Sequence, residues 1–170
     1  MSCIYIEDGF LSFQQCVELQ EILVNFPCEM YNGTYTYNIV NLWRTNHSLV
    51  DRILTKHRNY VNKMFPGSHT LRIQRGDVVR WPVGASMRPH YDIRETRSLL
   101  ASVCYLNDCD SGKTVFDNNL EVQPKAGRAV FFDGKHYEHS VTEVEGSDRY
   151  TLALWYEAGK MTNEHKERER

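Results

Sequence analysis

The sequence predicts a mostly β fold, an antiparallel sandwich or barrel preceded by N-terminal helices. Helical periodicity is confined to the first part of the chain, and after Gly67 apolar residues recur at every second position. Turn-forming groups such as Gly76-Asp77 and Asp110-Ser111-Gly112 punctuate this second part. No strand–helix–strand repeat is visible, which argues against a doubly wound parallel sheet.

Two amphipathic helices are predicted, over residues 12–25 and 48–64. Ser12 and Gln15 form a capping box, in which each side chain satisfies the other residue's backbone N–H. The second helix carries an apolar stripe at helical spacing from Val50 to Met64. Pro27 and Pro66-Gly67 follow the two helices, and proline cannot continue a helix.

The segment from Tyr31 to Arg44, between the helices, is aromatic, polar and poor in helix-forming residues. Two interpretations stay open for it. It is a hairpin packed on the core, or it is a mobile lid over a functional site.

Length and composition favour one globular domain. The chain has 170 residues, 41% of them hydrophobic and 25% charged, with a net charge of −2. This balance excludes a disordered chain and a nucleic-acid binder that acts through bulk positive charge. We expect one domain over residues 1–157, with the barrel from about residue 69 to 157, and a charged tail over 158–170.

The cysteines and the N-terminus suggest a cytoplasmic location. The five cysteines are odd in number and lack the spacing of a zinc site, so free thiols are expected. We expect no secretory signal and no membrane contact, because no basic segment precedes an apolar run and no run is long enough to span a bilayer.

His90-Tyr91-Asp92 is the most informative motif of the sequence. Residues two apart in an extended strand share a face, so His90 and Asp92 can reach one metal ion together. His139 offers a second imidazole far downstream, with His136 as its rival. Two histidines and one carboxylate, with open positions beside them, are typical of non-haem Fe(II) oxygenases.

Arg149 begins the inward face of the last predicted strand. A buried cation there is unfavourable unless it is paired, and the carboxylate of an organic co-substrate is a suitable partner. Tyr105 and Thr114 lie in strand-like segments from which a hydroxyl can reach the same carboxylate.

Taken together, a set of motifs resembles the prolyl 4-hydroxylase-like group of Fe(II)/2-oxoglutarate dioxygenases. They follow the order of that family from about Ile4 to Tyr156. The motifs are Asp8-Gly9-Phe10-Leu11-Ser12, Pro89-His90-Tyr91-Asp92, Tyr105-Leu106-Asn107-Asp108, Gly112-Lys113-Thr114-Val115-Phe116, Pro124-Lys125-Ala126-Gly127, and His139-Ser140-Val141 leading to Arg149-Tyr150.

The resemblance implies a double-stranded β-helix, or jelly-roll, that carries Fe(II) on His90, Asp92 and His139. Arg149 would pair with the distal carboxylate of 2-oxoglutarate, helped by Tyr105 and Thr114. The reaction would consume O2 and release succinate and CO2 as a substrate is hydroxylated, with ascorbate as an optional reductant. Trp81 departs from the family pattern, because many relatives have a tyrosine at this position.

Substrate contacts are predicted less sharply than the metal site. Tyr91 and Arg94 flank the metal ligands, and Tyr35 and Trp43 lie in the segment between the helices. The remaining arginines of the predicted strands are expected to form a solvated edge. They are Arg72, Arg75, Arg80, Arg88 and Arg97.

Three functions are considered from the sequence. The first is hydroxylation of a prolyl residue in a peptide or protein, and the second is hydroxylation of a free amino acid or small metabolite. The third is a non-catalytic metal-binding jelly-roll module. A nucleic-acid demethylase is disfavoured, since Trp155 stands where those relatives have a second arginine, and Asp92 disfavours a halogenase. The oligomeric state is not predicted.

Overall fold

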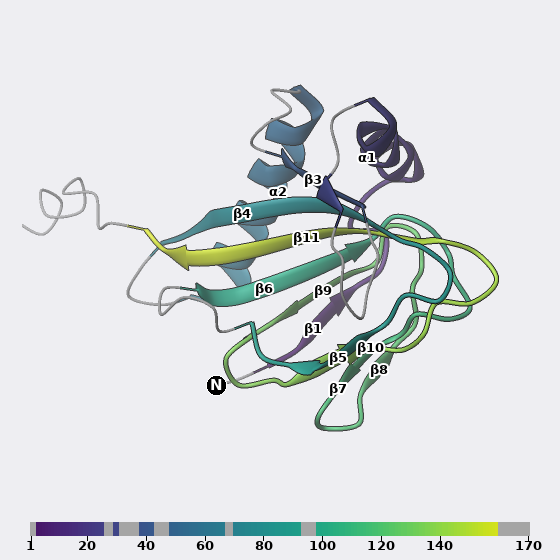
Figure 1. Cartoon of the computed structure of the whole chain (residues 1–170). Helices are drawn as coiled ribbons and strands as arrows, with labels where there is room; N and C mark the ends of the chain where they lie inside the picture. The colour runs from purple at the N-terminus through teal and green to yellow at the C-terminus, as the bar shows by residue number, and fades with distance from the viewer. Residues whose placement is uncertain are drawn as a thin grey trace, which may run out of the picture.

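Two antiparallel sheets face each other, and two helices cover the outer side of the larger sheet (Figure 1). The computed structural model describes residues 3–25, 29–30, 38–42, 48–66, 70–92 and 98–159. This arrangement confirms the predicted mostly β jelly-roll with N-terminal helices.

The larger sheet has the strand order β1-β9-β6-β11-β4-β3-β2. Its strands are β1 (Tyr5–Glu7), β2 (Glu29–Met30), β3 (Asn38–Asn41), β4 (Leu71–Trp81), β6 (Ser98–Tyr105), β9 (Ala129–Phe132) and β11 (Arg149–Ala158). The smaller sheet has the order β5-β10-β7-β8. Its strands are β5 (Met87–His90), β7 (Thr114–Phe116), β8 (Glu121–Val122) and β10 (His139–Val141).

The two helices form where the capping and apolar patterns predicted them. They are α1 (Phe13–Asn25) and α2 (Ser48–Met64). The capping box is present, because the backbone N–H of Ser12 donates to Gln15 Oε1 at 3.0 Å and that of Gln15 donates to Ser12 Oγ at 3.2 Å. Both helices bury an apolar stripe in the same core cluster as the sheet.

Both faces of β11 are covered, because the sheet lies between the helices and the smaller sheet. Leu152, Leu154 and Tyr156 are fully buried in the cluster that contains the helices. Arg149 and Thr151 alternate with them and point to the other face, toward the smaller sheet, where they are also buried. The space between the two sheets is therefore where polar residues are held out of water.

One predicted turn is wrong. Gly76-Asp77 lies inside β4, which runs unbroken from Leu71 to Trp81. Gly76 is needed there for packing, since a Cβ at this position would lie 2.8 Å from Leu154 Cδ2. The glycine therefore marks close packing under the helices, which is the other common reason for glycine in a strand.

Three strands, β1, β2 and β3, lie outside the predicted barrel. β1 pairs with β9 through Tyr5 to Glu7, and β3 pairs with β4 along its whole length. β3 also pairs with β2, which agrees with the hairpin interpretation for residues 38–41. Residues 31–37 and 43–44 lie outside the described part, so the lid interpretation is not tested there. No helix in the described part is long and apolar enough to cross a membrane.

Candidate metal and co-substrate site

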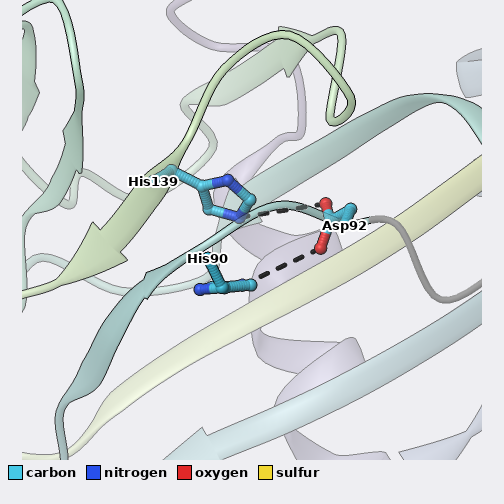
Figure 2. A group of neighbouring side chains, drawn as sticks. All are labelled: His90, Asp92 and His139. Atoms are coloured by element: carbon cyan, nitrogen blue, oxygen red, sulfur yellow. Dashed lines mark ion pairs between the residues drawn. The ribbon is translucent and has the colours of Figure 1, made fainter.

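The three predicted ligands converge between the two sheets. His90 ends β5, His139 begins β10, and the two are direct partners across these antiparallel strands. One donor atom from each of His90, Asp92 and His139 lies within 4.8 Å of the other two. Figure 2 shows both imidazoles turned toward the Asp92 carboxylate, with each Nε2 3.8 Å from one of its oxygens.

Backbone carbonyls orient both imidazoles. His90 Nδ1 lies 2.9 Å from the carbonyl oxygen of Arg88, and His139 Nδ1 lies 3.3 Å from that of Tyr137. A hydrogen bond at Nδ1 leaves Nε2 as the metal-binding atom. Burial lowers the pKa of His139, which favours the neutral imidazole that a metal requires.

Asp92 lies beyond the end of β5, so strand geometry alone does not hold it. Its backbone N–H donates to the carbonyl oxygen of Gly134 at 3.0 Å. A Cβ at Gly134 would lie 2.8 Å from Asp92 Cβ, so glycine makes room for the carboxylate. Gly134 was not identified from the sequence, because this contact joins segments that are distant along the chain.

Arg149 is enclosed beside Thr114 and Tyr105. It is 1% exposed, its Nη2 donates to Thr114 Oγ1 at 3.3 Å, and Tyr105 donates its hydroxyl hydrogen to the same oxygen at 2.7 Å. The guanidinium also lies over the rings of Trp81 and Tyr105, at 4.9 and 5.3 Å from their centroids. Three residues predicted to serve one co-substrate are thus in mutual contact.

The guanidinium of Arg149 has hydrogen-bond donors that the described residues do not satisfy. Within the described part of the chain, its Nε and Nη1 are buried and have no hydrogen-bond partner. Burial lowers the pKa of Arg149, because the charged form is separated from water. A carboxylate is the ligand that such unsatisfied guanidinium donors favour, so the donor set fits 2-oxoglutarate.

Strand register places this cation close to the three converging donors. On β7 and β10, Thr114 pairs with Val141 and Phe116 pairs with His139. Thr114, which contacts Arg149, lies two residues along β7 from Phe116, the strand partner of His139. Two residues of a strand span about 7 Å, so Thr114 and His139 are separated by about that distance along the strand direction. A five-carbon dicarboxylate is long enough to bridge such a gap.

Gly112 gives Arg149 its space. It has a φ of +62°, and a Cβ there would lie 2.8 Å from Arg149 Cδ. The sequence marked Gly112 as part of a motif, whereas the structure adds the reason for a residue without a side chain.

The rival and neighbouring residues take other roles. His136 does not join the cluster, since its side chain is 69% exposed and its Nδ1 lies 2.7 Å from Asp133 Oδ2. Trp81 has no hydroxyl for a co-substrate, and its Nε1 donates to Thr151 Oγ1 at 3.1 Å. The ring of Phe132 is buried and packs on that of His139, with ring centroids 4.7 Å apart.

The predicted substrate contacts are only partly within the described residues. Tyr91 is 44% exposed beside the cluster, which leaves it accessible to a substrate. Tyr35, Trp43 and Arg94 lie outside the described part of the chain. A histidine outside the site, His57, lies fully buried in α2.

Comparison with known proteins agrees with this geometry. The model of the 2OG-Fe(II) oxygenase superfamily matches residues 76–157, which contain His90, Asp92, His139 and Arg149. Among curated proteins, no relative matches the sequence significantly.

Solved structures share the fold at low sequence identity. The collagen prolyl hydroxylase of Paramecium Bursaria Chlorella virus-1, in complex with 2-oxoglutarate, is 20% identical with a TM-score of 0.78, covering 92% of this chain and 96% of its own. A Pseudomonas putida prolyl-4-hydroxylase is 20% identical with a TM-score of 0.77, covering 94% of each chain. The epimerase SnoN from nogalamycin biosynthesis is 16% identical with a TM-score of 0.78, covering 92% of this chain and 78% of its own.

The fold and the family match both point to Fe(II)-dependent oxygenases built on a jelly-roll. Over residues 76–157 the chain is similar to the 2OG-Fe(II) oxygenase superfamily, and its fold resembles that of prolyl 4-hydroxylase-like members. Its cofactor and co-substrates are those of the superfamily, namely Fe(II), 2-oxoglutarate and O2, as the sequence predicted. The use of ascorbate stays a prediction.

Proposed function

We propose that the chain is an Fe(II)- and 2-oxoglutarate-dependent hydroxylase in which His90, Asp92 and His139 hold the iron. The observation that carries this proposal is the buried guanidinium of Arg149, which has two nitrogens without a partner among the described residues. It contacts Thr114, which lies one same-face step from the level of His139 in the cluster of three metal-type donors. A structural metal site has no need of such a cation. This argues against the non-catalytic module.

Each residue of the site has a distinct task in this proposal. Arg149 binds the distal carboxylate of 2-oxoglutarate, and the hydroxyls of Thr114 and Tyr105 fix the guanidinium and line the same end. The rings of Trp81 and Phe132 enclose the site and keep water out. When bound, iron with 2-oxoglutarate and O2 supplies the oxidation of a substrate C–H bond to C–OH, with release of succinate and CO2.

For the substrate we propose a prolyl residue in a peptide or protein. The similarity to two prolyl hydroxylases supports this choice, and a further structure of the same fold is a prolyl hydroxylase from Trichoplax adhaerens bound to a peptide of hypoxia inducible factor. A free amino acid or small metabolite is the second candidate, since the same fold serves an epimerase of antibiotic biosynthesis.

Succinate release tests the proposal directly. Purified protein with Fe(II), 2-oxoglutarate and O2 is assayed with proline-containing peptides and with free amino acids, and products are identified by a mass gain of one oxygen. We expect succinate in equal amount to hydroxylated product. Iron-loaded protein that never consumes 2-oxoglutarate, with or without substrate, would refute the proposal.

A further inference from the structure

A row of side chains crosses the larger sheet at the level of the converging donors. Phe132 pairs with Ala101, Ala101 pairs with Trp155, and Trp155 pairs with Arg75. Direct partners in antiparallel strands present their side chains on the same face. Because the Phe132 ring packs on His139, this face is the one directed toward the site. Arg75 and Trp155 therefore belong to the wall opposite the smaller sheet.

Arg75 is held in place by a buried carboxylate. Its Nε and Nη2 both lie 2.7 Å from Asp77 Oδ2, and its guanidinium carbon lies 5.3 Å from the ring centroid of Trp155. The side chain of Asp77 is 2% exposed, whereas that of Arg75 is 48% exposed. The acid is thus covered and the cation is presented to solvent.

Only the acid of this pair loses its hydration, because the arginine stays half exposed. The covered carboxylate thus holds the guanidinium in place while the guanidinium can still meet a ligand. The next pair at the same end of the sheet repeats the pattern, with Arg72 and Glu157 in contact at 2.6 Å and exposed by 55% and 10%. Two covered acids at this end of the sheet therefore each hold an exposed arginine.

We propose that Arg75, positioned by Asp77 and stacked on Trp155, binds a carboxylate of the substrate and selects for acidic substrates. Arg149 does not compete for this role, because it is fully enclosed at the co-substrate end. A planar guanidinium on an aromatic ring is preorganised for a carboxylate. The carboxylate is either that of a free amino acid or that of an acidic side chain in a peptide. This inference rests on the proposed function and adds the charge of the substrate.

The variant that tests this inference must remove the cation without leaving a buried charge behind. Arg75→Gln alone would strand the Asp77 carboxylate, so the test uses the double variant R75Q/D77N, which is neutral and close in shape. The matched control is R80Q/D148N. Arg80 lies on the same strand, is 40% exposed and pairs with Asp148 at 2.7 Å. It faces the helices, since its strand partner Tyr150 packs on their cluster.

Binding is measured by thermal stabilisation of Mn(II)-loaded protein with 2-oxoglutarate. Each free L-amino acid is titrated against its carboxamide, and Pro-Glu peptides are titrated against Pro-Gln peptides. We expect at least one acid to bind about 10- to 100-fold more tightly than its neutral partner, as loss of a charge-assisted hydrogen bond predicts. Preference among free amino acids or among peptides identifies the source of the carboxylate.

The double variant R75Q/D77N should bind acid and neutral partner alike, while R80Q/D148N keeps the wild-type ratio. The inference is overturned if no acid is preferred, if R75Q/D77N retains the preference, or if the control loses it equally. Failure of the proposed function is separate. In that case 2-oxoglutarate itself does not stabilise the metal-loaded protein, and the acid-to-neutral ratio can still be measured.

Discussion

His139, and not the neighbouring His136, is the histidine of this segment that can serve as the third metal ligand. His136 and His139 are three positions apart, yet one lies on the surface with Asp133 and the other is buried against Asp92. Removal of a direct ligand costs more than loss of an outer partner, which typically weakens binding by about 10- to 100-fold.

We therefore expect His139→Ala to lower metal affinity by more than about 100-fold and to abolish turnover, while His136→Ala leaves both nearly unchanged. Mn(II) binding followed by electron paramagnetic resonance measures the affinity without requiring activity. Equal loss in the two variants would remove His139 from its assigned role.

In the proposed function, the partner of the buried charge of Arg149 is the carboxylate of the co-substrate. Replacing it with methionine removes an uncompensated cation, so Arg149→Met should leave the stability of the ligand-free protein unchanged or raise it by about 1 kcal/mol or more. The same change should weaken 2-oxoglutarate binding by at least about 30-fold, with metal binding retained. Chemical denaturation and calorimetry check the two effects. A large destabilisation of the ligand-free variant would make Arg149 a structural residue.

The donor side chains could be predicted because their types and order are chemically specific. His90, Asp92 and His139, which the sequence predicts as ligands, each bring a donor atom within 4.8 Å of the others, while their binding of a metal stays a prediction. Gly134 and the Arg75–Asp77 pair could not be predicted, because each depends on contacts between segments that are distant in sequence or on which strand face points inward.

Gly112, which precedes β7, leaves the space that the side chain of Arg149 occupies. Gly112 and Gly146 both have positive φ, 62° and 73°, but only Gly112 has Arg149 within reach of an added Cβ. We expect Gly112→Ala and Gly146→Ala each to cost about 1 kcal/mol in folding free energy through backbone strain. Only Gly112→Ala should also weaken 2-oxoglutarate binding, as calorimetry would show. Equal binding by both variants would mean that Arg149 adjusts freely to the added methyl group.

Helices were easier to predict than strands in this chain. Capping residues and apolar stripes are local signals, so α1 and α2 begin and end within one residue of the prediction. β1 has only three residues, and its pairing with β9 joins opposite ends of the sequence, so no local pattern marks it. Gly76-Asp77 resembles a turn in the sequence, because a glycine required for close packing under α2 has the same local signal as a glycine in a bend.

The packing of helices on the larger sheet also sets how the fold responds to acid. His57 is fully buried in α2, near the rings of Phe10 and Phe131, and its Nδ1 lies 2.9 Å from the carbonyl oxygen of Ile53. Desolvation lowers the pKa of His57 to about 4 from an ordinary value of 6.5. The unfolded chain therefore binds a proton between these values that the folded chain does not bind.

Stability should accordingly fall as pH is lowered from about 6.5 toward 4, by on the order of 3 kcal/mol from this residue alone. Urea unfolding at a series of pH values measures the effect. A His57→Leu variant should be less sensitive to pH over this interval by about that amount. The same pH dependence in the variant would assign the loss to other groups.

The two sheets contribute different residues to the site. The smaller sheet carries His90 and His139, the larger sheet carries Arg149 and the wall with Arg75, and the helices support the larger sheet from outside (Figure 1). In the proposed function 2-oxoglutarate spans from Arg149 to the metal, so the binding of metal and that of co-substrate should be coupled. Each partner alone leaves one end of that span unsatisfied.

Anaerobic calorimetry tests this coupling most directly, by titrating first Fe(II) into the protein and then 2-oxoglutarate into protein with and without iron. We predict one iron per chain, and one 2-oxoglutarate that binds at least about tenfold more tightly when iron is present. A protein that takes up no iron, or that binds 2-oxoglutarate equally well without it, would contradict the assignment of His90, Asp92, His139 and Arg149 to one site.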